Sequence, residues 1–160
     1  MTIQVGDNIP SSTLFYMTDT GVTKVTTDEL FSGKKVVLFA LPGAFTPTCS
    51  ASHLPGYVMK SNDILAKGID SIVCISVNDP YVMAAWGEQH NVASKVKMIA
   101  DGNGDFTRAI GLEINRADSG MGLRSQRYAM LINNGIVELL NVEQAGKFEI
   151  SDAETILHNL

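Results

Sequence analysis

The hydrophobic residues of this chain gather in short runs that turn-forming residues separate. Three runs have the length and the β-branched content of strands, at residues 36–40, 71–77 and 97–100. The run at 71–77 is apolar almost throughout, which a strand needs when helices cover both faces of its sheet. Segments with helical spacing lie between the runs, so the pattern predicts a parallel α/β centre.

Two further pairs of apolar runs flank turn signals and predict β-hairpins. Near the N-terminus the turn is Asp19-Thr20-Gly21. Towards the C-terminus it is Asn133-Asn134-Gly135, and Asn-Gly between apolar runs is the strongest short-range hairpin signal. The paired runs are 13–17 with 22–25, and 127–132 with 136–140.

Capping residues and prolines mark the helix starts. Residues 26–29 and 151–154 have the spacing of capping boxes. Asp79-Pro80 and Thr46-Pro47 each place an N-cap residue before a proline, which is favoured at the first helical position because its missing N–H costs nothing there. At Leu54-Pro55-Gly56 we expect the helix that begins at Thr46-Pro47 to bend or break.

Length and composition narrow the class of protein. A chain of 160 residues can bury one hydrophobic core without disulfides or metals to stabilise it, so we predict a single domain, 1–160. The net charge of −5 gives no reason to expect nucleic acid or an anionic membrane as a partner. The first residues lack the pattern of a signal peptide, and no apolar run has membrane-spanning length, so we expect a cytoplasmic protein.

The candidate chemistry centres on Cys49. This residue follows the strand at 36–40 and lies about three residues after the predicted helix start, where free backbone N–H groups and the helix dipole stabilise a thiolate. Thr46 would lie on the same face of that turn. The residues alone leave two interpretations open, a reactive thiol and a small buried cysteine at an ordinary loop-to-helix junction.

The motif around Cys49 resembles that of a known family. Pro42, Thr46 and Cys49 stand in a P-x-x-x-T-x-x-C arrangement, and the stretch from Pro42 to Ser50, followed by His53-Leu54-Pro55-Gly56-Tyr57, is similar to the type II, or peroxiredoxin-5-like, peroxiredoxins. The resemblance covers almost the whole chain. It implies a thioredoxin-like α/β fold, with a central mixed sheet flanked by helices and an N-terminal β-hairpin extension.

The resemblance also implies roles for four residues. Cys49 would attack a peroxide and form a sulfenic acid, Thr46 would hold a peroxide oxygen, and Pro42 would shield the sulfur from water. The family's distant arginine precedes an arginine-aromatic-small-methionine strand, which here points to Arg127. Arg124 is the competitor for that role. Without the resemblance, a solvated arginine at a strand edge would be the simpler interpretation of either one.

The second cysteine, Cys74, lies in the apolar run at 71–77, where a thiol is by default a small core residue. A resolving role would require its Cα within about 7 Å of that of Cys49, or local unfolding. No cysteine follows Cys74, so the resemblance implies regeneration by an external thiol, either glutathione with glutaredoxin or thioredoxin. It implies no metal, haem or flavin.

Three other sites are weaker candidates. A thioredoxin-type dithiol cannot form here, because Thr46 stands where the first cysteine of a Cys-x-x-Cys motif would be. Cys49 and His53 could pair as nucleophile and base, but we expect His53 to be an ordinary polar residue at the mouth of the site. Residues 101–105 resemble the start of a calcium loop, yet Phe106 and Leu112 replace the required glycine and glutamate. We predict instead a turn that caps the next helix.

The cluster of Tyr81, Met83 and Trp86 is expected to pack in the core. Because the family pairs subunits near the active-site loops, Phe45 and part of this cluster could instead lie in the interface of a homodimer. The prediction from the sequence is therefore a thiol peroxidase. The alternative, from another functional class, is a redox-sensing or chaperone-like interaction protein that uses Cys49 as an oxidation switch.

Overall fold

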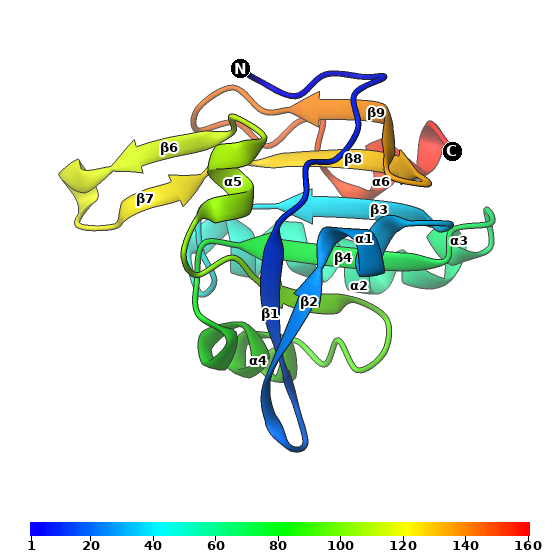
Figure 1. The fold of residues 1–160 in the computed structure, drawn as a ribbon. Coiled ribbons are helices and arrows are strands. Elements are labelled where there is room, and N and C mark those ends of the chain that lie inside the picture. Colours follow the sequence, from blue (N-terminus) through cyan, green and yellow to red (C-terminus); the bar gives the residue numbers. More distant parts are fainter.

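The computed structural model describes residues 1–160 and contains a seven-stranded mixed sheet (Figure 1). The order of its strands is β2-β1-β5-β4-β3-β8-β9. The bounds of the strands are β1 Thr13–Thr18, β2 Gly21–Thr26, β3 Lys35–Ala40, β4 Ser71–Ser76, β5 Lys97–Ala100, β8 Tyr128–Asn133 and β9 Ile136–Val142.

The centre of the sheet is parallel, as the alternation of strands and helices predicts. Strand β4 pairs in parallel with β3 and β5, whereas β8 runs antiparallel to β3. Both predicted hairpins are present, β1 with β2 at one edge and β8 with β9 at the other. Asn134 and Gly135 have φ angles of 51° and 78°, a conformation that asparagine and glycine tolerate best. This is the thioredoxin-like arrangement with an N-terminal hairpin.

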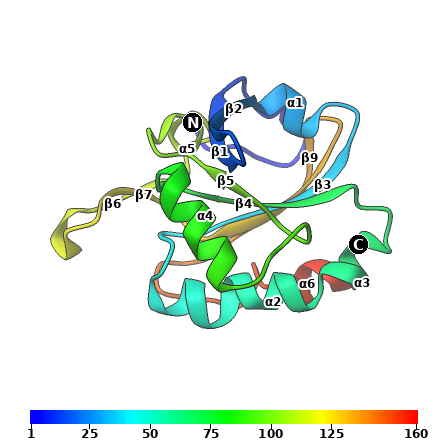
Figure 2. The ribbon, with the colours of Figure 1, turned by 90° about the horizontal axis from the view of Figure 1, so that it is seen from below.

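Helices cover both faces of the sheet (Figure 2). One face carries α2, α3, α4 and α6, and the other carries α1 and α5. None of the helices is both long enough and apolar enough to cross a membrane. Their bounds are α1 Thr27–Phe31, α2 Leu54–Met59, α3 Ser61–Leu65, α4 Pro80–Gln89, α5 Asp105–Ala109 and α6 Ala153–His158, with a π-helical turn η1 at Cys49–His53 and a 3-10 turn η2 at Ala117–Ser119.

Strand β3 divides the core into two layers because its side chains alternate between the faces. Val37 and Phe39 point to the layer under α2 and α4, and Val36 and Leu38 point to the layer under α1 and α5. All four are fully buried. The end of β3 therefore leads into the loop before Cys49 from a fixed position at the centre of the sheet.

Two of the predicted side-chain caps hold, and one is displaced. Thr26 and Glu29 form the predicted capping box, and Asp79 accepts from the Val82 N–H at 2.8 Å. At the last helix the prediction of Ser151 as N-cap is wrong. Asp152 is the cap, with its carboxylate accepting from the Thr155 N–H, because the Ser151 hydroxyl is engaged elsewhere.

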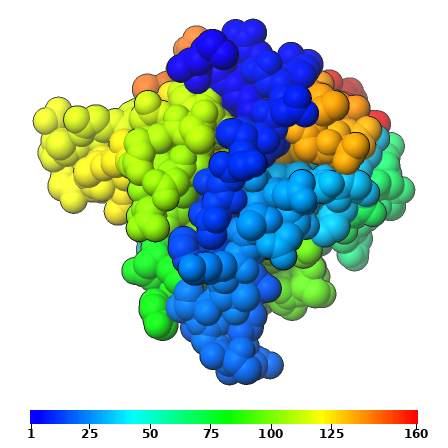
Figure 3. Space-filling model, in the orientation of Figure 1, coloured from blue at the N-terminus to red at the C-terminus, as the bar shows by residue number.

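A two-stranded arm was not predicted. Strands β6 (Glu113–Arg116) and β7 (Gly122–Ser125) pair with each other and extend away from the body of the molecule (Figure 3). Each strand has four residues and much of each is exposed, so neither shows an apolar run or a clear alternation. The glycines of the turn, Gly120 and Gly122, have φ angles of 73° and 66° and were the available signal.

Candidate active site

The helix that carries Cys49 begins as predicted, with Thr46 before it and Pro47 as its first helical residue. Of the bend or break predicted at Leu54-Pro55-Gly56, the break does not occur, because the backbone stays helical through α2. The adjustment lies one turn earlier, where the Leu54 N–H donates to the Cys49 carbonyl in a wider π-helical turn. Such a turn lets Pro55, which has no N–H, enter the helix without breaking it.

The sulfur of Cys49 is covered completely by protein. Its side chain is 0% exposed and lies in the core layer under α2 and α4. A single polar side chain reaches the sulfur: Nη2 of Arg127 donates to Sγ at 3.2 Å. Arg127 immediately precedes β8, so the strand pairing of β8 with β3 fixes its backbone beside the loop that leads to Cys49. The guanidinium therefore places fixed N–H donors beside the sulfur.

His53 orients the same guanidinium from the other side. Its Nδ1 lies 2.8 Å from Nη1 of Arg127 and its Nε2 lies 3.1 Å from the Ser151 carbonyl oxygen. Because arginine can only donate, Nδ1 is the acceptor and Nε2–H donates to Ser151. Burial, followed by the charge of Arg127, lowers the pKa of His53 to about 3. The prediction of a polar residue at the mouth of the site is wrong, since His53 is 0% exposed.

These contacts also exclude the Cys49–His53 pair as nucleophile and base. Both ring nitrogens of His53 already have partners, and neither partner is the sulfur. A neutral imidazole held in this way serves as a support for Arg127, and it has no free nitrogen with which to accept a proton from Cys49.

A buried carboxylate, Glu143, fixes the segment that supports His53. Its Oε2 accepts four hydrogen bonds at 2.8 Å, from the N–H groups of residues 149–151 and from the Ser151 hydroxyl. Burial raises the pKa of Glu143, but these donors outweigh it and the net pKa is lowered, so the carboxylate stays ionised. Glu143 thus holds Ser151 in the position that accepts from His53.

Sequence reasoning missed Glu143, Ser151 and Tyr57 as parts of the site. The Tyr57 hydroxyl donates to the Ser151 carbonyl at 2.7 Å, and its ring stacks on Phe39 at 3.9 Å. Glu143 follows β9 in a polar stretch, where a glutamate gives no sign of being buried. The link from Glu143 through Ser151 and His53 to Arg127 joins positions far apart in the sequence, so no local pattern could have indicated it.

Thr46 immediately precedes the helix, and its hydroxyl proton is already used in a hydrogen bond. Its Oγ1 donates to the Gly43 carbonyl at 2.6 Å, so it is not a side-chain cap of the helix. The oxygen keeps free lone pairs and can accept a hydrogen bond from an incoming O–H group. Pro42 begins the turn that supplies the Gly43 carbonyl, and both Pro42 and Thr46 line the cavity described below.

The competitor Arg124 has a different place from Arg127. Its Nε donates to the Met121 carbonyl at 3.0 Å and its Nη1 to the Pro42 carbonyl at 3.3 Å. These bonds tie the β6–β7 arm to the loop before Cys49. The structure therefore brings Arg127 to the sulfur and leaves Arg124 as a brace between two loops.

Trp86 of α4 holds the residue after Cys49. Its Nε1 donates to the Ser50 hydroxyl at 2.9 Å. Trp86 and Met83 are buried, as predicted for core residues, but the same prediction is wrong for Tyr81, which is 66% exposed. Phe45 is 48% exposed and has a φ angle of 64°, a strained conformation for a bulky side chain. The loop before Cys49 therefore exposes an aromatic ring at Phe45, and α4 exposes a second one at Tyr81.

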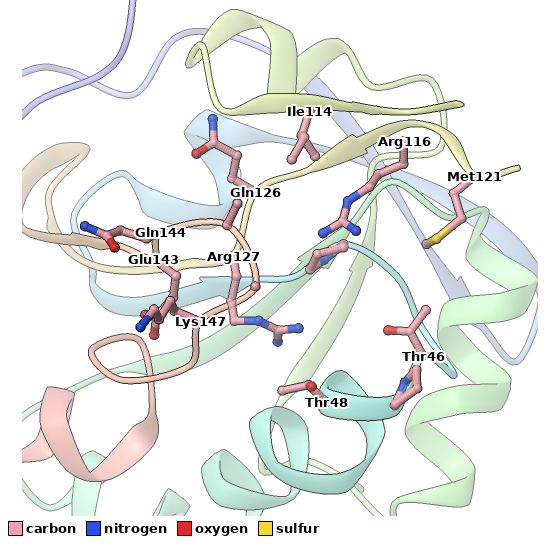
Figure 4. Close-up of a pocket in the computed structure, with 14 residues that line it drawn as sticks. Thr46, Thr48, Ile114, Arg116, Met121, Gln126, Arg127, Glu143, Gln144 and Lys147 are labelled. Carbon is pink, nitrogen blue, oxygen red and sulfur yellow. The ribbon is translucent and has the colours of Figure 1, made fainter. Parts of the chain in front are cut away.

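A cavity of about 320 Å³ opens above this group of residues (Figure 4). Cys49 does not line it, but Arg127 does, so this guanidinium connects the cavity with the sulfur. The wall nearest the helix is made by Thr46, Pro47 and Thr48. The rest of the lining comes from the β6–β7 arm and the loop after β9, namely Ile114, Arg116, Met121, Gln126, Glu143, Gln144, Ala145, Gly146 and Lys147.

The remaining candidates lie apart from this cavity. Cys74 is fully buried in β4, both cysteines are free thiols, and burial raises the pKa of Cys74 well above its ordinary range. The Asp101 carboxylate accepts from the backbone N–H groups of Phe106 and Thr107, which is the predicted helix-capping turn. The structure brings no three side chains of the metal-ligating types together.

Comparison with known proteins gives consistent matches over the length of the chain. Residues 4–157 match the Redoxin family. Peroxiredoxin-2D of Arabidopsis thaliana is 47% identical over 159 residues, which covers 99% of this chain and 98% of the relative. Peroxiredoxin-2E of the same plant, a chloroplastic protein, is 49% identical over 162 residues, covering 99% of this chain and 69% of the relative.

Solved structures agree with these matches. Reduced Prx3 from Vibrio vulnificus in complex with hydrogen peroxide has a TM-score of 0.96 and 52% identity, with 99% of each chain covered. Peroxiredoxin 5 from Alvinella pompejana has a TM-score of 0.86 and 34% identity, with 98% of this chain and 96% of that chain covered.

Proposed function

The chain belongs to the peroxiredoxin family, in its type II branch, and on that premise we propose that it is a thiol peroxidase that reduces hydrogen peroxide and alkyl hydroperoxides at Cys49. The observation that carries this proposal is the position of Arg127. Its guanidinium donates to the Cys49 sulfur and also lines the cavity through which a peroxide would arrive.

The residues of the site divide the chemistry among them. The Cys49 thiolate attacks the nearer peroxide oxygen, an S–O bond forms as the O–O bond breaks, and Cys49 becomes a sulfenic acid. The departing oxygen takes a proton and leaves as water or an alcohol. Fixed donors on Arg127 stabilise the charge that develops on the oxygens, and the free lone pairs of Thr46 accept the peroxide O–H. Pro42 covers the site on the side of the loop.

We infer that an external thiol returns the sulfenic acid to the thiol. Cys74 is held within β4, with two hydrogen-bonded strand neighbours, and cannot move to Cys49 without disturbing the centre of the sheet. Glutathione with glutaredoxin, or thioredoxin, would supply the two electrons, and the free state of both cysteines is compatible with the reducing cytoplasm that we propose as the location.

We also propose that the protein acts as a homodimer. Phe45 in the active-site loop and Tyr81 on α4 are large exposed aromatic side chains, and the ring of Phe45 lies 6.4 Å from that of Trp86, which also belongs to α4. A second copy that covers these rings would remove apolar area from water and hold the strained backbone of Phe45. Analytical ultracentrifugation of the wild type and of Phe45→Ser with Tyr81→Ser tests this, since the variant should sediment as a monomer.

Two serine variants test the peroxidase itself. Cys49→Ser should abolish thiol-dependent peroxide consumption, because an alcohol at this position is a far weaker nucleophile. Cys74→Ser should keep most of the activity when an external thiol is supplied. If Cys74→Ser were as inactive as Cys49→Ser, the assignment of an external reductant would be wrong.

Stopped-flow kinetics separate the peroxidase from the oxidation switch. With excess peroxide and a thiol system, a peroxidase consumes many equivalents of peroxide, whereas a sensor is oxidised once and stops. Parallel measurements with glutathione and glutaredoxin, and with thioredoxin, identify the reductant. Consumption of only one equivalent with every reductant would favour the switch.

A further inference from the structure

The cavity above Cys49 is larger than a hydrogen peroxide molecule requires. The proposed peroxide chemistry uses Arg127, Thr46 and Pro42 of its lining, and Arg127 is the one that contacts the sulfur. The rest of the lining comes from the β6–β7 arm and the loop after β9, and nothing in the proposed peroxide chemistry uses it. Its volume of about 320 Å³ leaves room for a ligand with many more atoms than a peroxide.

This unused part of the lining is positively charged. Arg116 from the arm and Lys147 from the loop after β9 both line the cavity, and they lie to either side of Arg127 in Figure 4. The one acidic residue in the lining is Glu143, and its Oε2 is occupied by four hydrogen-bond donors. The surplus of cations contrasts with the chain as a whole, whose net charge is −5.

Arg116 is placed so that it can bind a ligand. It ends β6, its side chain is half-buried, and its Nε is buried without a hydrogen-bond partner. Arg124 fixes the arm that carries it by donating to the Pro42 carbonyl. Lys147 has only a loose ion pair, 3.8 Å to Glu149, between side chains that are 54% and 67% exposed. Such an exposed ion pair contributes little to stability, so Lys147 can leave Glu149 for another anion at a small cost in free energy.

We propose that Arg116, assisted by Lys147, forms a subsite for the carboxylates of a small acidic thiol that reduces the sulfenic acid of Cys49. This inference rests on the proposed function and names the class of its reductant. Arginine pairs with carboxylates through two parallel hydrogen bonds, and a buried Nε without a partner gains from such an acceptor. Hydrogen peroxide has no charge and gains nothing from these two cations.

Two thiols reduce the sulfenic acid in two steps. The thiolate of the reductant attacks the sulfur of the sulfenic acid, a mixed disulfide forms, and the hydroxyl leaves as water after taking a proton. A second thiol attacks the mixed disulfide on the reductant's sulfur and releases Cys49 as a thiol together with an oxidised disulfide. The subsite acts in the first step by holding the acidic groups while the incoming sulfur reaches Cys49.

The test compares three thiols of different charge on the two halves of the cycle. The protein is oxidised with one equivalent of hydrogen peroxide and mixed with glutathione, which is acidic, with 2-mercaptoethanol, which is neutral, or with cysteamine, which is cationic. Loss of sulfenic acid is followed by quenching with dimedone and mass spectrometry. The variants are Arg116→Ala and Arg116→Glu. The matched control is Arg108→Ala, an exposed arginine on α5 that pairs with Asp105 and does not line the cavity.

Arg116→Ala should lower the rate constant with glutathione relative to that with 2-mercaptoethanol by roughly fivefold to tenfold, since it removes a charged hydrogen bond from a half-buried site. Arg116→Glu should lower this ratio further and raise the rate with cysteamine. Arg108→Ala should leave the ratio at its wild-type value. Equal slowing of all three thiols, or no slowing of glutathione, would overturn the subsite.

Failure of the proposed function gives a different result in the same experiment. If wild-type protein formed no sulfenic acid with hydrogen peroxide, the peroxidase assignment itself would fall before any thiol was added. A selective loss in Arg116→Ala of oxidation by an acidic organic hydroperoxide, with thiol rates unchanged, would assign the subsite to the oxidising substrate and would overturn the present inference.

Discussion

The two cysteines of this chain are buried to the same extent and differ in what surrounds the sulfur. Both are 0% exposed and both belong to the core layer under α2 and α4. Cys49 lies in the first turns of a helix and receives a hydrogen bond from Arg127. Cys74 lies in β4 among apolar side chains, and burial, followed by the charge of Cys49, raises its pKa. Because the two thiols are equally buried, we expect the cationic donor at the sulfur of Cys49 to decide which of them reacts.

The largest expected effect comes from removing that donor. Arg127→Gln should lower the rate of Cys49 oxidation by about 10²- to 10³-fold, because it removes a fixed charge from the reacting atoms. Cys49 would then resemble Cys74, as a buried thiol without a charged partner. Competition with catalase for hydrogen peroxide measures the rate.

Arg124→Gln is the matched control for this change. It removes the same charge a short distance away, from a side chain that braces Pro42 and does not contact the sulfur. We expect a much smaller loss of rate than in Arg127→Gln. Equal losses in the two variants would show that overall positive charge, rather than contact with the sulfur, distinguishes Cys49.

A smaller effect is expected at Thr46. Thr46→Val should slow the oxidation of Cys49 by roughly tenfold to a hundredfold, since it removes the oxygen that accepts the peroxide O–H. Thr46→Ser should retain most of the rate because it keeps the hydroxyl. Thr48→Val, which changes a neighbouring threonine of the same cavity, should have little effect. A loss in Thr48→Val as large as that in Thr46→Val would remove Thr46 from its proposed role.

Part of this site could be predicted from the sequence and part could not. The loop from Pro42 to Cys49, the strands on which it depends and the position of Arg127 just before β8 all follow from local patterns or from the family motif. The surroundings of Arg127 do not. His53 looked like a surface residue because a histidine four positions after a cysteine in a helix gives no sign of burial, and its partner Ser151 lies 98 positions away.

Two further predictions about helices failed, one through a tertiary contact and one through a local change of helix type. Ser151 has the sequence context of an N-cap, but Glu143 takes its hydroxyl and shifts the cap to Asp152. Pro55 has no N–H and could break the helix, but in the π-helical turn before it the Leu54 N–H donates to the Cys49 carbonyl and the helix continues. In each case a local preference was correct in kind, and a long-range partner or a change of helix type altered the outcome.

A more modest effect should follow from changing the support of Arg127. Glu143→Gln keeps the shape of the side chain but replaces charged acceptors with a neutral one, so Ser151 and His53 should lose part of their order. We expect about 1–2 kcal/mol lower stability in urea and a several-fold slower oxidation of Cys49. Glu113→Gln, at an exposed position on the β6–β7 arm, should be neutral in both measurements. An unchanged oxidation rate in Glu143→Gln would show that Glu143 does not support Arg127 in its position at the sulfur.

The last expected effect is on the pH dependence of stability and changes no residue that contacts the sulfur. The pKa of His53 is lowered to about 3 from 6.5 in the folded protein, so the unfolded chain binds a proton more readily. The stability that this neutral histidine gives is fully present above about pH 6.5 and is lost as the pH falls towards 3. Between pH 6.5 and 4.5 the loss should reach about 1.4 kcal/mol per pH unit. Urea titrations of wild type and His53→Asn should show a flatter dependence in the variant, and equal slopes would contradict a buried neutral His53.

The most direct test of the central claim is to identify which sulfur a peroxide oxidises. Wild-type protein treated with less than one equivalent of hydrogen peroxide in the presence of dimedone, digested and analysed by mass spectrometry, gives the extent of sulfenic acid at each cysteine. We predict dimedone on the peptide that contains Cys49 and none on the peptide that contains Cys74. Equal labelling of the two, or labelling of Cys74 alone, would contradict the assignment of reactivity to the thiol that Arg127 contacts.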